Sequence, residues 1–124
     1  MDIKQAIAEH LDLILTDPEI HYTTSPKNTP APYCVITLIS EPHDDSHEGE
    51  DGAIESRVQI DWFADTDTEA VNLAKETHTA MLQLQGGALN IARVKLDDKY
   101  DNYETDTSLF HRGLDYLIQF EERE

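Results

Sequence analysis

The sequence holds one cysteine, Cys34, and no apolar run near the ~20 residues that a membrane-spanning helix needs. A single cysteine excludes an intramolecular disulfide. Its place in an apolar stretch indicates a small buried residue rather than a reactive thiol. The first ten residues lack a basic region followed by an apolar one, so we expect no secretory signal and no membrane partner. These absences favour a protein made in the cytoplasm.

Basic residues are scarce. The 124 residues contain 9 Lys and Arg against 26 Asp and Glu, which gives a net charge of −17. Binding to nucleic acid through phosphates requires clustered Lys and Arg, so this class of function is excluded. The acidic surplus leaves open high solubility, repulsion or mimicry of DNA, and attraction to a basic partner.

Motifs for catalysis are missing as well. The chain has no G-x-S-x-G, no Gly-rich phosphate loop before a helix and no C-x-x-C. One compact group combines imidazoles and carboxylates: His43, Asp44, Asp45, His47 and Glu48. It lies in an acidic stretch bounded by Pro and Gly rather than on a helix, which favours a solvated loop over a metal site. We interpret His78 and His111 as structural, and we predict no catalytic residue, no metal ligand and no cofactor.

The segment from Ala53 to Leu84 has the clearest pattern. Its first half alternates, with Ile54, Ser56, Val58, Ile60 and Trp62 on one side, as in a strand with one buried face. Thr66 and Glu69 then stand in the S/T-x-x-E relation of a capping box, which predicts a helix starting after Thr66. We expect that helix to continue to Gln85 and to end at Gly86 and Gly87.

Other elements follow from shorter patterns. The spacing predicts a first helix over residues 2–16, with Ile3, Ile7, Leu11 and Ile14 buried. A Pro-rich connector covers residues 21–32, and strands are expected at 33–40, 90–96 and 109–120, with a bulge at Gly113. Ala92, Val94 and Leu96 are expected to face inward. The charged stretches 41–52 and 97–106 are interpreted as a long hairpin loop and a second acidic loop, and residues 121–124 as a frayed tail.

These elements predict one α+β domain over residues 1–124, in the order α-β-β-α-β-β. We expect two layers, a four-stranded, mainly antiparallel sheet with both helices on one face. The opposite face is polar enough for water or for a subunit interface, with Arg57, Asp61 and Asp115 among its residues. The core is expected to contain Val35, Ile54, Val58, Ile60, Trp62, Val71, Met81, Leu114, Tyr116 and Ile118.

Three stretches together resemble a known family. They are PYCVI at residues 32–36, RVQIDWFA at 57–64 followed by an Ala-rich helix, and the run VKLDDKYDNYETDTSLFHRGLDY at 94–116. Their order and spacing are similar to the tail completion proteins of bacteriophages and prophages, including tail-to-head joining and tail-terminator-like neck proteins. The resemblance implies a virion structural protein that closes the head-proximal end of the tail, as a hexameric ring. Its implied partners are further copies of itself, the tail tube protein and the head connector or stopper, with DNA passing through the lumen unbound.

We place the expected subunit and partner contacts in the two acidic stretches. The interface residues predicted there are Glu41, His43, Asp44, Asp45, His47, Glu48, Glu50, Asp51, Asp97, Tyr100, Tyr103 and Glu104. Two alternatives remain open from the sequence. One is an acidic protein-binding module that mimics DNA, and the other is a small metal-dependent enzyme using His43 and His47.

Overall fold

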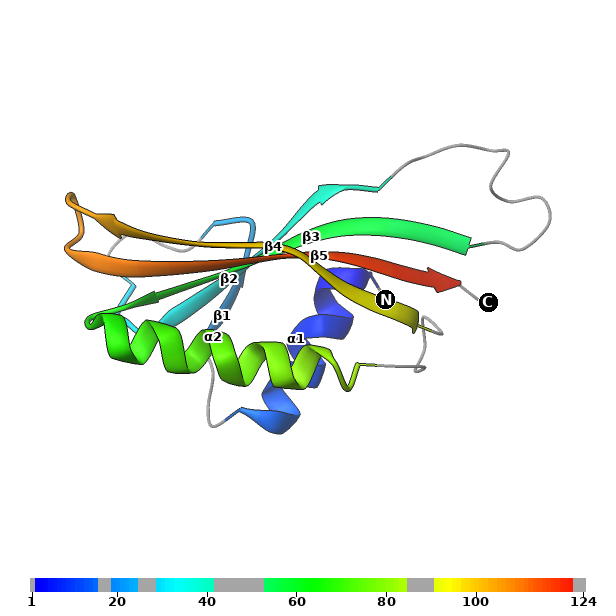
Figure 1. Ribbon diagram of the computed structural model, residues 1–124, viewed down its shortest axis with the longest axis horizontal. Helices are drawn as coiled ribbons and strands as arrows, with labels where there is room; N and C mark the ends of the chain where they lie inside the picture. Colours follow the sequence, from blue (N-terminus) through cyan, green and yellow to red (C-terminus); the bar gives the residue numbers. More distant parts are fainter. Residues whose placement is uncertain (1, 16–18, 25–28, 42–52, 85–90, 122–124) are drawn as a thin grey trace.

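The computed structural model describes residues 2–15, 19–24, 29–41, 53–84 and 91–121 (Figure 1). It contains two helices and one sheet. The elements are α1 (Ile3–Ile14), β1 (Ile20–Tyr22), β2 (Tyr33–Ser40), β3 (Ala53–Ala64), α2 (Asp67–Met81), β4 (Ile91–Glu104) and β5 (Leu109–Glu121). Neither described helix has the length and apolar character required to cross a membrane.

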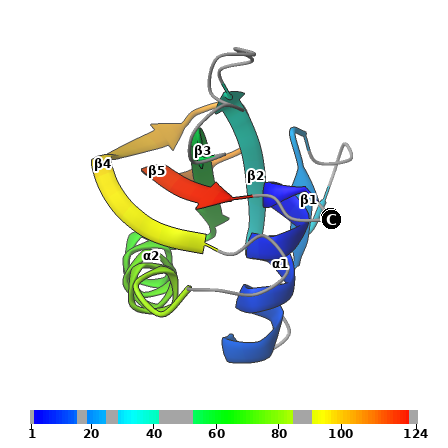
Figure 2. The same ribbon diagram turned by 90° about the vertical axis from the view of Figure 1, so that its right-hand side faces the viewer.

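The sheet has five strands in the order β1-β2-β3-β5-β4. β1 runs parallel to β2, and every other neighbouring pair is antiparallel. Both helices lie on the same side of the sheet (Figure 2), and their apolar side chains share one core with β2, β3, β4 and β5. The α+β class is therefore confirmed, but the sheet is five-stranded and mixed rather than four-stranded.

The additional strand comes from the start of the predicted connector. Ile20, His21 and Tyr22 pair with Cys34, Val35 and Ile36. A parallel strand this short has no room for a recognisable alternation, and nearby prolines suggested a turn-rich connection. The prediction that all of residues 21–32 form a turn-rich connector is wrong at this end, because His21 and Tyr22 belong to β1.

The first helix begins where Asp2 caps it, because the Asp2 carboxylate accepts a hydrogen bond from the Gln5 N–H at 2.8 Å. Ile3, Ile7 and Leu11 are buried as predicted, but Ile14 is 44 % exposed. Figure 1 shows the reason, since α1 runs away from the sheet and its last turn is the farthest from it. Leu15, just beyond the helix, is buried in place of Ile14.

The second helix begins as the capping signal predicts. The Thr66 hydroxyl accepts a hydrogen bond from the Glu69 N–H at 3.2 Å. The helix ends at Met81, not at Gln85, and the glycines expected to stop it lie outside the described residues. The indole N–H of Trp62 donates to the Thr77 hydroxyl at 2.7 Å, which ties β3 to α2 inside the core.

The alternation predicted for β3 is confirmed. Ser56, Val58, Ile60 and Trp62 are buried, and Ile54 is half-buried against the same core. Most of the residues expected in the core have almost no exposed surface: Val35, Val58, Ile60, Trp62, Met81, Leu114, Tyr116 and Ile118. Val71 is half-buried, and Val35 belongs to a small separate cluster with Tyr33 and Leu109.

The largest correction concerns β4. The predicted acidic loop at 97–106 is mostly strand, because β4 continues to Glu104 and pairs with β5 along its length. Residues 105–108 alone form the turn of this hairpin. Charged residues are compatible with an edge strand that has one solvated face, since their side chains keep their hydration. Ala92 is exposed and not inward, because the register shifts between Ile91 and Arg93.

Two smaller predictions about β5 are also wrong. Gly113 lies in regular register with Asp61 on one side and Tyr100 on the other, so it marks no bulge. Glu121 belongs to β5, so the predicted frayed tail cannot begin before residue 122.

Candidate interaction surface on the outer face of the sheet

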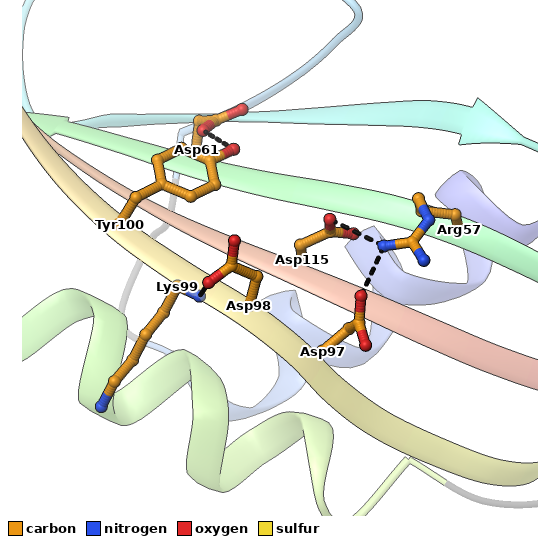
Figure 3. A network of polar contacts seen from close by, with 7 residues as sticks. All are labelled: Arg57, Asp61, Asp97, Asp98, Lys99, Tyr100 and Asp115. Carbon is orange, nitrogen blue, oxygen red and sulfur yellow. Dashed lines mark hydrogen bonds and ion pairs between the residues drawn. The ribbon is translucent and has the colours of Figure 1, made fainter.

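The face of the sheet that points away from the helices, here called the outer face, carries a charged cluster around Arg57. Its guanidinium Nη1 donates to Asp97 on β4 at 2.8 Å and to Asp115 on β5 at 2.9 Å (Figure 3). The hydrogen bonds to Asp97 and then Asp115 raise the pKa of Arg57 above its usual value. One arginine thus joins β3, β5 and β4, while the buried Oδ1 of Asp115 has no hydrogen-bond partner among the described residues.

A second cluster surrounds Asp61, whose side chain is nearly buried although the sequence placed it on a solvated face. Its residue exposure is 6 %. Oδ1 contacts the Nε2 of His111 at 2.6 Å, and Gln59 donates to Oδ2 at 2.8 Å. The hydroxyl of Tyr100 donates to Oδ1 at 3.5 Å (Figure 3). These contacts offset the free-energy cost of removing the Asp61 carboxylate from water.

Gly113 allows this second cluster to form. A Cβ atom at this position would collide with the ring of Tyr100 and would lie 2.8 Å from Oδ1 of Asp61. The ring can therefore lie flat across β5 and reach Asp61 only because residue 113 has no side chain. Burial, and then the charge of Asp61, raise the pKa of the Tyr100 phenol, which keeps its proton for this hydrogen bond.

Aromatic rings cross the same end of the outer face. Tyr33 stacks on Phe63 at 4.9 Å between ring centroids, and Phe63 stacks on His111 at 4.6 Å. Tyr100 meets His111 edge-on at 5.8 Å. This row runs over β2, β3, β5 and β4, and it packs the imidazole that contacts Asp61.

The structure brings four of the predicted interface residues together on β4, in a strand rather than a loop. Asp97 and Tyr100 are tied into the two clusters, and Tyr103 is 46 % exposed over Phe110. Glu104 accepts a hydrogen bond from Thr107 at 3.3 Å. Glu41 lies at the far end of β2 and accepts from Ser56 at 2.5 Å. The remaining predicted residues lie outside the described part of the chain: His43, Asp44, Asp45, His47, Glu48, Glu50 and Asp51.

Sequence reasoning did not identify the contacts of Asp61, His111 and Gly113. It placed Asp61 on a solvated face and interpreted His111 only as structural. The sequence did contain one signal for this contact. The alternating patterns of β3 and β5 place Asp61 and His111 on the same face of the sheet. The antiparallel register that brings them together depends on which strands are neighbours, and that order was not predicted.

The described residues contain neither a cluster of metal ligands nor an exposed thiol. No group of three or more His, Cys, Asp or Glu side chains there is placed to hold a metal ion. Cys34 is buried, and burial raises the pKa of its thiol, so a nucleophilic thiolate is disfavoured. What remains is a rigid, charged and aromatic surface next to an open strand edge.

Comparison with known proteins agrees with this structural picture. Among solved structures, the chain is similar to one in the virion of a native gene transfer agent particle, with a TM-score of 0.63 and 12 % identity. That match covers 96 % of this chain and 94 % of the other, and at this identity it shows a shared fold. No curated protein matches. The family described as tail completion protein gp17 matches over residues 5–121, which confirms the resemblance seen in the sequence. The chain therefore belongs to the tail completion protein gp17 family and is a structural protein of phage-like virions.

Proposed function

We propose that this chain completes the head-proximal end of a phage tail as a ring of identical subunits and joins the tail to the head connector. The observation that carries the proposal is the family match, which spans nearly the whole chain. The similar chain is part of a virion particle, which supports placing this chain inside an assembled particle as well.

Features of the fold suit a ring subunit. β4 is a long edge strand, and no strand among the described residues pairs with its outer hydrogen-bonding groups. Such an edge is open to pairing or packing with another chain. A ring needs two different surfaces on each subunit, so that one copy can contact the next head to tail. The β4 edge and the α1 side lie at opposite margins of the molecule, which meets this requirement (Figure 2).

The acidic character suits a position around passing DNA. With a net charge of −17, the subunit repels the phosphate backbone rather than holding it. The partners in this proposal are the tail tube protein, the head connector or stopper, and further copies of the chain. In this role the subunit only has to hold its neighbours in place, and it needs no cofactor and carries out no chemical step.

Deletion of the gene from the phage or prophage that encodes it tests the proposal. We expect full heads and separate tails in electron micrographs of the lysate, with joining restored when the gene is supplied in trans. A matched control restores the gene with a change at an exposed α2 position outside the groove described below, Asn72→Gln, and should behave as the wild type. Normal joined particles from the deletion strain would contradict the proposed role.

A further inference from the structure

A groove lies between α2 and the edge strand β4, on the helix side of the sheet. Its volume is about 590 Å³. α2 packs mainly against β5 and β3, so part of the inner face of β4 remains uncovered. The floor of the groove is apolar and is formed by Val71, Ala74, Leu96 and Leu114. Leu114 is buried, whereas Val71, Ala74 and Leu96 are half-buried, so part of this apolar floor is accessible to another molecule.

The rim of the groove is basic in a chain that is otherwise strongly acidic. Three of the 9 Lys and Arg residues line it, Lys75, Lys99 and Arg112, and one acid, Asp101, lines it beside Arg112. Neither lysine forms an ion pair with any described residue. Arg112 binds Asp67 at 3.0 Å and lies 3.5 Å from Asp101, yet its buried Nε has no partner in the described part of the chain. The groove therefore suits an apolar occupant that carries carboxylates.

The end of α1 has these properties. Leu13 is 85 % exposed and Ile14 is 44 % exposed, so both offer apolar surface at the end of the helix. The exposed acids Glu9 and Asp12 lie on the same two turns. Burying such aliphatic side chains favours a contact, and the carboxylates match the basic rim.

The end of α1 cannot fill the groove of its own chain. α1 packs beneath β2, whereas the groove opens at the β4 edge (Figure 2). A second copy can supply it. We propose that the α1 end of one copy, with Leu13 and Ile14 at its centre, docks into the α2–β4 groove of the next copy. The contact joins two different surfaces, so its repetition closes into a ring when the rotation permits. This inference rests on the proposed ring, and it specifies which surfaces of neighbouring subunits meet in that ring.

Disulfide trapping in the full chain tests the contact. Leu13→Cys is made in one sample and Thr79→Cys, at an exposed position that lines the groove, in another. Cys34 is buried and does not compete. We expect mixed dimers when the two variants are oxidised together and none from either variant alone. The double variant should give a ladder of covalent oligomers.

Two controls separate docking from random collision. Ile39→Cys replaces Leu13→Cys at a similarly apolar position, 48 % exposed on β2, and should give no mixed dimer with Thr79→Cys. Adding Lys75→Glu and Lys99→Glu to the groove variant should slow cross-linking about tenfold. Adding Glu9→Lys and Asp12→Lys to the partner should restore the rate, which a merely unfolded variant could not do.

Absence of mixed dimers up to the solubility limit, with both thiols reactive toward a small reagent, would overturn the inference. Equal trapping by Ile39→Cys and Leu13→Cys would also overturn it. Cross-linking of Thr79→Cys to a different protein on isolated tails would assign the groove to that partner instead. The gene deletion described above is independent of these outcomes, so the ring contact and the role in joining can fail separately.

Discussion

At the scale of single residues, Asp61 and Gly113 decide how the outer face is built. Asp61 is a nearly buried carboxylate held by His111, Gln59 and Tyr100. Tyr100 reaches it only across the backbone of Gly113. A strand glycine is usually replaceable by alanine with a small gain in stability, because alanine restricts the unfolded chain. Here the contact with the tyrosine ring reverses that expectation.

We expect Gly113→Ala to lower the free energy of unfolding by about 1–3 kcal/mol, the usual cost of forcing a methyl group into filled space. In a Tyr100→Ala background the same change should lose most of its cost, since the colliding ring is gone. Urea unfolding of the four proteins measures the coupling. Equal effects of Gly113→Ala in the two backgrounds would show that the ring is not what excludes the side chain.

Tyrosine ionisation gives the second residue-scale prediction. Burial raises the pKa of Tyr116, whose hydroxyl contacts Nδ1 of His78 at 2.8 Å. A raised pKa in the folded state contributes stability that is fully present below the unfolded value near 10 and is lost as pH rises further. The free energy of unfolding should therefore fall above about pH 10, by up to about 1 kcal/mol per pH unit from this residue.

The matched variant for this measurement is Tyr116→Phe, which has no ionisable phenol. Its unfolding free energy should be lower at pH 8, through loss of the His78 contact, and should decline less steeply above pH 10. Parallel slopes for the two proteins between pH 9 and about 11.5 would mean that Tyr116 does not carry the alkaline loss.

At the scale of elements, α2 and β3 form the centre of the molecule. The central strand pairs with β2 and β5, and α2 covers it through Trp62 and Thr77. Both partners of this hydrogen bond are buried. A buried donor that loses its acceptor incurs its full desolvation cost.

Thr77→Val keeps the shape of the side chain but removes the acceptor of the indole N–H. We expect a loss of about 1–3 kcal/mol in the free energy of unfolding. Thr79→Val is the control on the same helix, because Thr79 is exposed and donates only to the Lys75 carbonyl, and it should change stability by less than about 0.5 kcal/mol. Similar losses in the two variants, measured by urea unfolding, would indicate a helix-propensity effect instead.

Elements with a repeating pattern were predictable, and those determined by their neighbours were not. The alternation of β3 and the cap at Thr66 follow from local chemistry, and both are present. The second half of β4 was missed because its charges resemble a loop, and only pairing with β5 makes it a strand. The contacts of Asp61 depend on strand order for the same reason. The groove was missed because it lies between elements that are adjacent only in the folded chain.

At the scale of the whole molecule, charge and shape act together. The outer-face acids Asp97 and Asp115 are compensated by Arg57, and Asp61 is held by His111, whereas the acids of residues 41–52 have few bases nearby in sequence. Apart from Glu41, that acidic segment lies outside the described residues. In a ring around DNA, we propose that it repels the phosphates and eases their passage.

Reversal of four acids of this segment to lysine tests the effect of charge on DNA passage. In the particles that assemble, the variant Asp44→Lys, Asp45→Lys, Glu48→Lys, Asp51→Lys should slow DNA ejection, because the reversed charge attracts phosphate. The same four positions changed to Ser are the control for loss of the acids alone, and should have a smaller effect. Unchanged ejection from intact lysine-variant particles would exclude this role of the segment.

The central claim, that this chain forms the ring between tail and head, is tested most directly by a cryo-electron microscopy reconstruction of the neck of the virion. The account predicts a closed ring of this chain between the tail tube and the head connector, with the helices and five-stranded sheet described above fitting each subunit. A neck whose density contains no copy of this fold, in particles that carry joined heads and tails, would contradict it.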